Sequence, residues 1–410
     1  TNVYLDWQAV TVADGSTTLS AVAGRGYFLD TNTGVIEVFL PTSPSRGDTI
    51  ALVDYSGTFA TNQLIINTGG QLIDSTSGPD FKVTTNNSIV ELVYIDANKG
   101  WQVILNQAAG TTPDAILTPS GQYGAKIVAT GGTVTTDGDF KIHTFTGDGN
   151  FVVSAISPTA ADNEVSYVVV AGGGGGGSGG LRSAGGGGAG GYRESKSGVD
   201  NYTASPVAGS ADITITATTF PITVGAGGAG ATSDGKGSNG NNSVFSTITS
   251  TAGGAGGGQG SGPGNNGGSG GGGGDRGNGS DPGGNGNTPP VSPSQGNNGG
   301  TSSAFPNSAG GGGGGIGAVG ANGHPTGGNG GAGVASEITG SSVTRAGGGG
   351  GGHPSNPGCG GAGGGGNGAG PSPTPGTTGT ANTGGGGGGG NQNNGTAGGK
   401  GIVIIRYKFQ

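Results

Sequence analysis

Short apolar runs alternate with polar, turn-forming residues along the first quarter of the chain. Between residues 1 and 107 these runs are rich in β-branched and aromatic residues and recur about every ten residues: GYFLDT, GVIEVFLP, DTIALVDYSG, NQLIIN and SIVELVYID. Gly, Pro, Asn and Asp separate them, as in sandwiches or small barrels. No segment keeps the period of an amphipathic helix. We therefore predict an all-β module over residues 1–107.

Residues 108–122 are small, polar and proline-containing, and they predict a linker. Strand-like runs resume in residues 123–170. In FKIHTF, Phe140 and Ile142 alternate with Lys141 and His143, which is the pattern of a half-exposed strand. We predict that this β-strand segment leads into the next domain.

A glycine-rich region begins after Ala171. In SYVVVAGGGGGGSGG an apolar run gives way to six consecutive glycines, which by themselves would suggest a flexible linker. The chain nevertheless ends on the apolar run IVIIRYKFQ, and a disordered tail has no reason to end on an aggregation-prone strand. We therefore predict an ordered domain over residues 171–410, closed by a strand at Ile402–Arg406 that pairs near Tyr167–Val170.

Composition and charge limit the functions that the chain can have. The formal net charge is −8, and no basic run occurs, so we expect no nucleic-acid binding. No stretch approaches the roughly 18 apolar residues of a membrane span, so we expect no membrane insertion. The one cysteine excludes an internal disulfide. Because the chain has no methionine and no signal peptide precedes Thr1, we expect a fragment or processed product. Its low charge and abundant Thr, Ser and Asn are compatible with an exposed, extracellular type of surface.

The glycines suggest a core that is built from backbone. The chain has 107 glycines, most of them after residue 170, and 30% hydrophobic residues, so ordinary packing could stabilise its first half but not its second. A polyproline-II-like helix has about three residues per turn and directs its N–H and C=O groups outward. Helices of pure glycine can therefore pack closely and bond to one another. We predict a polyglycine-II helix bundle over residues 171–410, framed by β-strands and essentially without α-helix.

Uninterrupted and interrupted runs have different predicted places in such a bundle. An enclosed helix must be glycine throughout, whereas an outer helix can turn one side chain per turn toward water. The predicted interior helices are Gly172–Gly177, Gly310–Gly315, Gly347–Gly352 and Gly384–Gly390. The predicted outer helices are Gly225–Gly230, Gly253–Gly258 and Gly327–Gly333.

The segments that frame the glycine runs resemble a known family. GGTVTTDGDFKIHTFTGDGNFVV, YVVVAGGGGGGSGG, ITVGAGGAG and GGKGIVIIRY are similar to glycine-rich domains of bacteriophage tail-fibre proteins, particularly of marine phages, and to tail-fibre tip adhesins built as polyglycine-II sandwiches. The resemblance covers roughly Gly131–Gln410, and residues 1–107 resemble β-modules of the same fibres. It implies a virion protein in which loops between the glycine helices bind the host receptor. This chain departs from the adhesins by its own upstream module and by longer, more polar connections.

Motifs for catalysis and cofactors are weak. Gly230–Lys236 (GATSDGK) begins like a phosphate-binding loop, but Gly237 stands where Ser or Thr is required. GGGGGD, ending at Asp275, begins like a calcium-binding nonapeptide but lacks its apolar residue and does not repeat. His353 and Cys359 are too few ligands for a structural zinc site. We expect no enzyme activity, no cofactor and no metal.

Interface chemistry gathers in a few segments between the glycine runs. Aromatic and arginine side chains are the usual anchors of protein interfaces. The segments Asp275–Ser308 and His353–Cys359 combine length with charged, aromatic or ring-bearing residues, which makes them the strongest candidates. The predicted receptor-binding residues are Tyr192, Arg193, Asp275, Arg276, Pro289, Pro290, Phe305, His324 and His353.

Three functions are compatible with these observations. The favoured one is a non-enzymatic adhesin of a phage tail fibre, which binds an outer-membrane protein or polysaccharide of a bacterial host and assembles with other fibre subunits, a homotrimer being one arrangement. The second is an extracellular filament or surface-layer protein that a glycine lattice stiffens. The third is an ice-binding protein, which we rank last because long polar loops interrupt the glycine runs irregularly.

Overall fold

The computed structural model describes residues 5–75, 80–107, 115–117, 123–125, 127–157, 160–210, 212–277 and 279–409. These residues fall into two compact units, Thr1–Ala125 and Lys126–Gln410, which are described separately. The prediction of an all-β fold is confirmed, because the one helical element among the described residues is a 3-10 turn, η1 (Ala160–Asn163). The predicted linker 108–122 lies outside the described residues, apart from β11 (Ala115–Leu117), which pairs with β12 (Tyr123–Ala125).

The first unit consists of two sheets that share one apolar core. Consecutive strands from β3 to β7 alternate between the two sheets, so parallel pairs such as β4 with β6 and β5 with β7 form within each sheet. The inward-facing side chains, among them Leu29, Ile36 and Trp101, are fully buried. The strands are β1 (Asp6–Trp7), β2 (Thr11–Val12), β3 (Thr18–Ser20), β4 (Arg25–Asp30), β5 (Ile36–Phe39), β6 (Thr49–Asp54), β7 (Leu64–Asn67), β8 (Phe81–Val83), β9 (Ser88–Asp96) and β10 (Gly100–Gln107).

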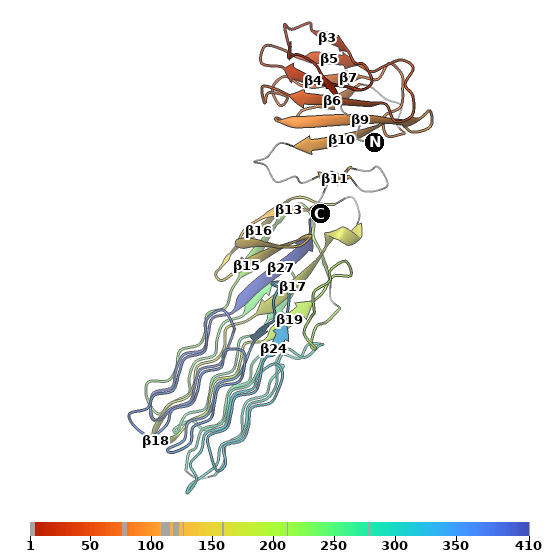
Figure 1. Cartoon of the computed structure of the whole chain (residues 1–410). Helices are drawn as coiled ribbons and strands as arrows, with labels where there is room; N and C mark the ends of the chain where they lie inside the picture. Colours follow the sequence, from red (N-terminus) through yellow and green to blue (C-terminus); the bar gives the residue numbers. More distant parts are fainter. Residues whose placement is uncertain are drawn as a thin grey trace. The chain divides into compact units, whose positions relative to one another are not determined.

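The second unit begins with two sheets, of order β13-β16-β21-β22-β23 and β14-β15-β27-β17-β19. The terminal strand β27 lies at the centre of the latter sheet, where Ile402 pairs with Val170 and Ile405 with Tyr167 (Figure 1). The predicted closing strand is therefore confirmed. The strands of this part are β13 (Val128–Thr130), β14 (Thr133–Asp137), β15 (Phe140–Phe145), β16 (Gly149–Ala155), β17 (Glu164–Val170), β19 (Tyr192–Ser195), β20 (Ile213–Thr214), β21 (Thr219–Thr223), β22 (Ser243–Phe245), β23 (Ile248–Ser250) and β27 (Ile402–Lys408).

Glycine runs extend from these sheets and lie side by side as a bundle of long, nearly parallel segments (Figure 1). The short strands β24 (Val334–Ser336) and β25 (Val343–Arg345) lie near the sheets, whereas β18 (Gly179–Ser183) and β26 (Asn391–Asn393) pair at the opposite end of the bundle. We call the end that carries the sheets the sheet end and the end that carries β18 and β26 the tip.

Backbone hydrogen bonds between the runs repeat every third residue. Along the run Gly172–Gly177, Gly172 and Gly175 donate to Asn241 and Ser238, Gly173 and Gly176 to Gly399 and Thr396, and Gly174 and Gly177 to Gly188 and Gly185. The carbonyl groups of the same run accept from three other segments with the same repeat, at Gly253 and Gly256, Gly228 and Ala231, and Gly387 and Gly390. This run is therefore enclosed by other chain segments, and its core contacts are hydrogen bonds.

Burial separates interior runs from outer ones. The runs Gly172–Gly177, Gly310–Gly315, Gly347–Gly352 and Gly384–Gly390 are buried along their whole length. The runs Gly225–Gly230 and Gly327–Gly333 instead expose one residue in three: Ala226 and Ala229 in the first, Asn329 and Ala332 in the second.

The interrupted run Gly253–Gly258 differs from the prediction, because it is buried throughout rather than placed on the outside. Its one methyl group, on Ala255, is fully buried. The N–H of Ala255 donates to the side-chain Oδ1 of Asn239 rather than to a backbone carbonyl, at 2.9 Å. The side chain of Asn239 thus lies between Ala255 and the neighbouring backbone. The two backbones are held further apart there than by a direct backbone hydrogen bond, which leaves space for the methyl group of Ala255.

A buried histidine couples the stability of the second unit to pH. The His143 ring is fully buried, with Nδ1 2.7 Å from the carbonyl oxygen of Gly131 and Nε2 3.2 Å from the hydroxyl of Tyr407. Burial disfavours the charged ring and lowers the pKa of His143 below its ordinary 6.5.

We expect this unit to lose stability as the pH falls from 6.5 toward 5.5. The unfolded chain takes up a proton on His143 at about pH 6.5, whereas the folded chain does so only at lower pH, so acid favours unfolding by at most about 1.4 kcal/mol per pH unit. Urea denaturation at several pH values measures the slope. His143→Phe should flatten it, and an unchanged slope in that variant would contradict the assignment.

Candidate functional site

The predicted binding residues separate into two groups at opposite ends of the second unit. The N–H of Asp275 donates to the carbonyl of Ser183 in β18, which puts Asp275 and Arg276 at the tip. Phe305, His324 and His353 belong to turns at the same end, next to the tip ends of the runs that begin or end at Gly310 and Gly352. Tyr192 and Arg193 belong to β19 at the sheet end.

Two expectations about these segments are corrected. Asp275–Ser308 does not form one set of loops, because its middle part returns to the sheet end: Gln295 accepts from the N–H of Tyr192 and its side chain donates to the carbonyl of Pro289. Pro289 and Pro290 are therefore far along the bundle from Asp275. Tyr192 and Arg193 lie in a strand rather than in a loop.

Two of the predicted residues support the structure through their side chains. The Tyr192 ring is 2% exposed, and its hydroxyl donates to Oε2 of Glu194 at 2.8 Å. His353 is 7% exposed, and its Nδ1 accepts from the backbone N–H groups of Ser355 and Asn356, which closes the turn. Burial lowers the pKa of His353, in keeping with this acceptor role.

The tip combines charged, aromatic and apolar side chains. Arg276 pairs with Asp281, whose Oδ2 lies 3.0 Å from Nε of Arg276. Arg182 of β18 lies between two further groups: its Nη1 is 3.5 Å from Oδ2 of the buried Asp275, and its guanidinium is 5.9 Å from the centre of the Phe305 ring. The Phe305 ring is 72% exposed, so the tip presents an aromatic face beside a positive charge.

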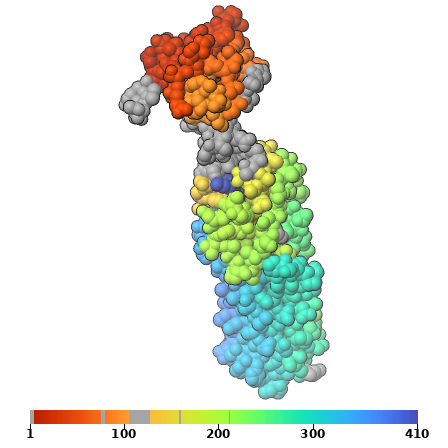
Figure 2. Space-filling view, turned by 90° about the vertical axis from the view of Figure 1, so that its right-hand side faces the viewer, coloured from red at the N-terminus to blue at the C-terminus, as the bar shows by residue number. Residues whose placement is uncertain are grey.

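A hollow lies beside Phe305. Its volume is about 410 Å³, and hydroxyl, amide and imidazole groups line most of it, including Ser280, Thr301, Ser303, Asn307 and His324. A second hollow of about 290 Å³, between Arg276 and Asp281, shares Ser280 with it. Together we call them the tip hollow. In Figure 2 the cyan segments, near residue 300 on the colour bar, form the visible surface at this end of the unit.

Two tip residues were missed by the sequence reasoning, Leu181 and Arg182. Leu181 is 82% exposed, the most exposed large apolar side chain among the described residues. The available signal was the sequence GGLRSAGG, in which a large apolar residue and a charge interrupt two glycine runs that are otherwise made of small residues. Such residues gain nothing inside a backbone-bonded core, so their place must be outside it.

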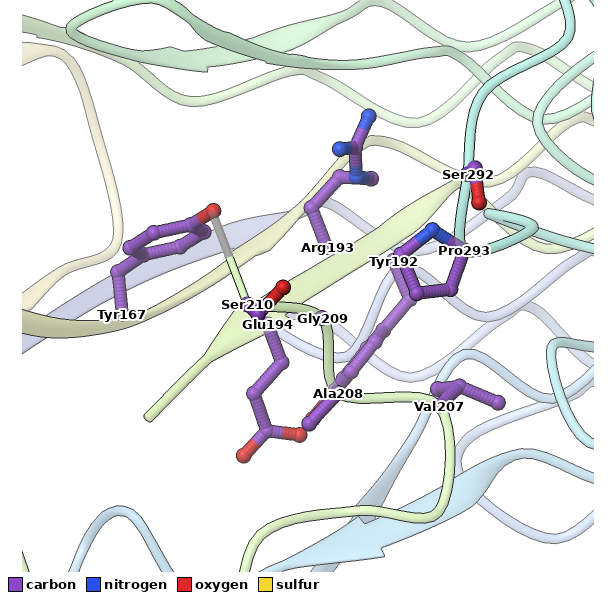
Figure 3. A pocket seen from close by; sticks show the side chains of 10 residues that line it. All are labelled: Tyr167, Tyr192, Arg193, Glu194, Val207, Ala208, Gly209, Ser210, Ser292 and Pro293. Atoms are coloured by element: carbon purple, nitrogen blue, oxygen red, sulfur yellow. The ribbon is translucent and has the colours of Figure 1, made fainter. Parts of the chain in front are cut away.

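A larger cavity of about 490 Å³ lies at the sheet end, beside the edge strand β19 (Figure 3). Its walls come from β17, β19, the segment around Gly209 and the segment around Pro293. We call it the sheet-end cavity. Of the predicted residues it brings together Tyr192 and Arg193, while Pro289 and Pro290 are not part of its wall.

Within the described residues, no three His, Cys, Asp or Glu side chains are grouped so that they could hold a metal ion. Cys359 is an exposed free thiol. The described part of the chain also contains no helix that is long and apolar enough to cross a membrane.

Comparison with known protein families gives a match that covers most of the second unit. A glycine-rich domain family matches residues 144–408, from within β15 to the end of β27. A search of curated proteins found no match. The matched region contains both sheets' central strands and all the glycine runs. On this match over more than half of its length, the chain belongs to the glycine-rich domain family.

Proposed function

We propose that this protein is part of a bacteriophage tail fibre and acts there as a non-enzymatic adhesin, with the tip as the surface that meets a bacterial receptor. One observation carries the proposal: the exposed side chains of Leu181 and Phe305 and the half-buried Arg182, all suited to an interface, gather beside a hollow at the tip. Aromatic and arginine side chains anchor interfaces. Loops held by a rigid scaffold can vary in sequence without loss of the fold.

The same proposal includes a polyglycine-II bundle as the scaffold. Its support is the three-residue repeat of backbone hydrogen bonds along Gly172–Gly177 and the one-in-three exposure of Ala226, Ala229, Asn329 and Ala332. Both are expected of helices with about three residues per turn. A core that consists of backbone leaves recognition to the segments at its ends.

The receptor that we propose is an outer-membrane protein or a polysaccharide on the host cell, and the other partners are further fibre subunits. The hydroxyl and amide lining of the tip hollow fits sugar hydroxyls, and the exposed ring of Phe305 fits an apolar sugar face or a protein side chain. No step of covalent chemistry is needed for this role.

We expect Phe305→Ala to weaken binding to host cells at least about tenfold, because it removes the exposed aromatic ring at the tip. The measurement is binding of the labelled protein to a panel of bacterial isolates, followed by titration on a strain that it recognises. Val319→Ala is the matched control, since Val319 is 62% exposed in the turn at the sheet end that follows Ile316. Equal losses in both variants, or none in Phe305→Ala, would contradict the tip as the contact surface.

Ice binding stays as a second candidate because the outer runs expose small residues at every third position, such as Ala226 and Ala229. A regular array of small groups is what that function requires. Thermal hysteresis of the purified protein distinguishes the two functions, since an adhesin should show none.

Negative-stain images that show filaments formed by the protein alone would instead favour the role of an extracellular filament or surface-layer protein.

A further inference from the structure

The sheet-end cavity is a shaped site and not merely a gap beside the sheet. Two loops are fixed to the outer edge of β19: the N–H of Gly209 donates to the carbonyl of Glu194 at 2.8 Å, and the N–H of Tyr192 donates to the carbonyl of Gln295 at 3.0 Å. The cavity lies between these attachments. Its volume of about 490 Å³ falls within the range of small-molecule sites, roughly 300–1,000 Å³.

Arg193 and Glu194 point to opposite sides of β19 (Figure 3). This follows from strand geometry, because successive side chains alternate between the two faces of a sheet. Glu194 is 3% exposed, and its carboxylate accepts from four groups on its own side: the hydroxyls of Tyr192, Tyr202 and Ser336, and the N–H of Ser205. The Glu194 carboxylate is therefore hydrogen-bonded by these four groups and does not form an ion pair with Arg193.

The Arg193 guanidinium makes no hydrogen bond and no ion pair with any residue that the structure describes. The other carboxylate near this side of the strand, Asp212, accepts a hydrogen bond from the hydroxyl of Ser195 at 2.8 Å. An arginine that lines a cavity without a partner has five N–H donors to offer a ligand. The unpaired guanidinium of Arg193 is therefore a local positive charge in a protein whose net charge is −8.

The remaining lining groups define what this arginine would bind. The hydroxyls of Tyr167, Ser210 and Ser292 border the cavity, and Val207 and Pro293 supply apolar wall. The planar guanidinium matches the two oxygens of a carboxylate. One positive charge balances one carboxylate, whereas a doubly charged phosphate would be left with excess negative charge in an acidic protein.

We propose that the sheet-end cavity binds a small carboxylate, of the size and polarity of a uronic acid sugar, with Arg193 as the group that holds the carboxylate. The hydroxyls of Ser210 and Ser292 then face the hydroxyls of the sugar ring. This site lies at the opposite end of the second unit from the tip, so it does not depend on the adhesin role.

The test is titration of the whole chain with glucuronate, followed by calorimetry or by chemical shifts. We expect saturable binding of glucuronate, with glucose and inorganic phosphate each at least about tenfold weaker. Arg193→Gln should weaken glucuronate binding at least about tenfold, and Arg193→Lys less, because lysine keeps the charge but loses the fork of donors.

Two controls keep the result interpretable. Arg46→Gln removes an exposed arginine from the first unit and should leave glucuronate binding unchanged. A melting curve for each variant shows whether the second unit is folded. Arg193 has no hydrogen-bond or ion-pair partner among the described residues, so its replacement should not lower the midpoint. Absence of glucuronate binding, equal binding of glucose or phosphate, or full binding in Arg193→Gln would each overturn the proposal.

Discussion

Gly312→Val and Gly387→Val are each expected to abolish the cooperative folding of the second unit. A Cβ atom on Gly312 would overlap the carbonyl oxygen of Asn329, and one on Gly387 would overlap that of Thr396. These atoms are backbone and cannot rotate away as a side chain would. Each neighbouring segment is itself bonded on several sides, so the displacement spreads through the bundle. The expected loss of unfolding free energy is at least about 3 kcal/mol.

Thermal unfolding and limited proteolysis measure this loss. Ala332→Val is the matched control, because Ala332 is exposed on an outer run and its side chain already points to water. Asn391, which lies outside the uninterrupted runs, is not a suitable control: it is 2% exposed and belongs to β26, paired with Ser183. Similar melting midpoints for Gly312→Val, Gly387→Val and Ala332→Val would show that the runs are not held together by close backbone contact.

The sheets of the fold were predictable because their signals are side chains. The run Ile402–Ile405 is β-branched and apolar inside a polar, glycine-rich region, and such a run is stable only when paired and covered. Its pairing with Val170 and Tyr167 follows, since those residues are the other strongly apolar run next to a glycine segment. Apolar side chains carry this information wherever they occur.

The two ends of the bundle were not predictable, because the direction of a glycine run leaves no trace in its sequence. The chain reverses at Gly267–Gly268 and again at Gly363–Gly364 without any charged, aromatic or proline residue at the turn. Gly363 and Gly364 have φ values of 95° and 100°, which glycine adopts freely. Pro289 and Pro290 were grouped with Asp275 because the segment that returns from the tip to the sheet end between them, residues 282–287, is short and contains no long glycine run.

The candidate sites show the same division. Phe305 and Arg276 were singled out from the sequence because aromatic and arginine side chains are the usual anchors of interfaces, and both lie at the tip. The sheet-end cavity was predictable only in part. Arg193 was singled out from the sequence, but Ser210 and Ser292 were not, because their position depends on the two loops that contact β19. The sequence thus indicated which side chains are suited to binding, but only the path of the chain in the fold determines which of them lie side by side.

Arg406→Met is expected to destabilise the second unit by about 3–5 kcal/mol, because it leaves a buried carboxylate without its partner. Arg406 and Asp200 are each 1% exposed at their side chains, and Nε of Arg406 lies 2.9 Å from Oδ1 of Asp200. Nη1 lies 2.8 Å from Oδ2 of Asp137, and the guanidinium stacks 4.4 Å from the centre of the Phe140 ring. One arginine thus joins the terminal strand β27 to β14, to β15 and to the segment around Asp200.

Removing both charges separates the penalty of an unpaired carboxylate from the loss of packing. Asp200→Asn combined with Arg406→Met should recover part of the loss, because the amide of asparagine keeps its hydrogen bond with the hydroxyl of Ser166 without a buried charge. Urea denaturation measures both variants, with Lys408→Met on the same strand as the control, expected within about 0.5 kcal/mol of the parent. If the double variant is less stable than Arg406→Met alone, the buried charge is not the source of the penalty. The role of Arg406 would then be to pack against Phe140 and to fix the terminal strand, on whose place in the sheet the glycine runs depend.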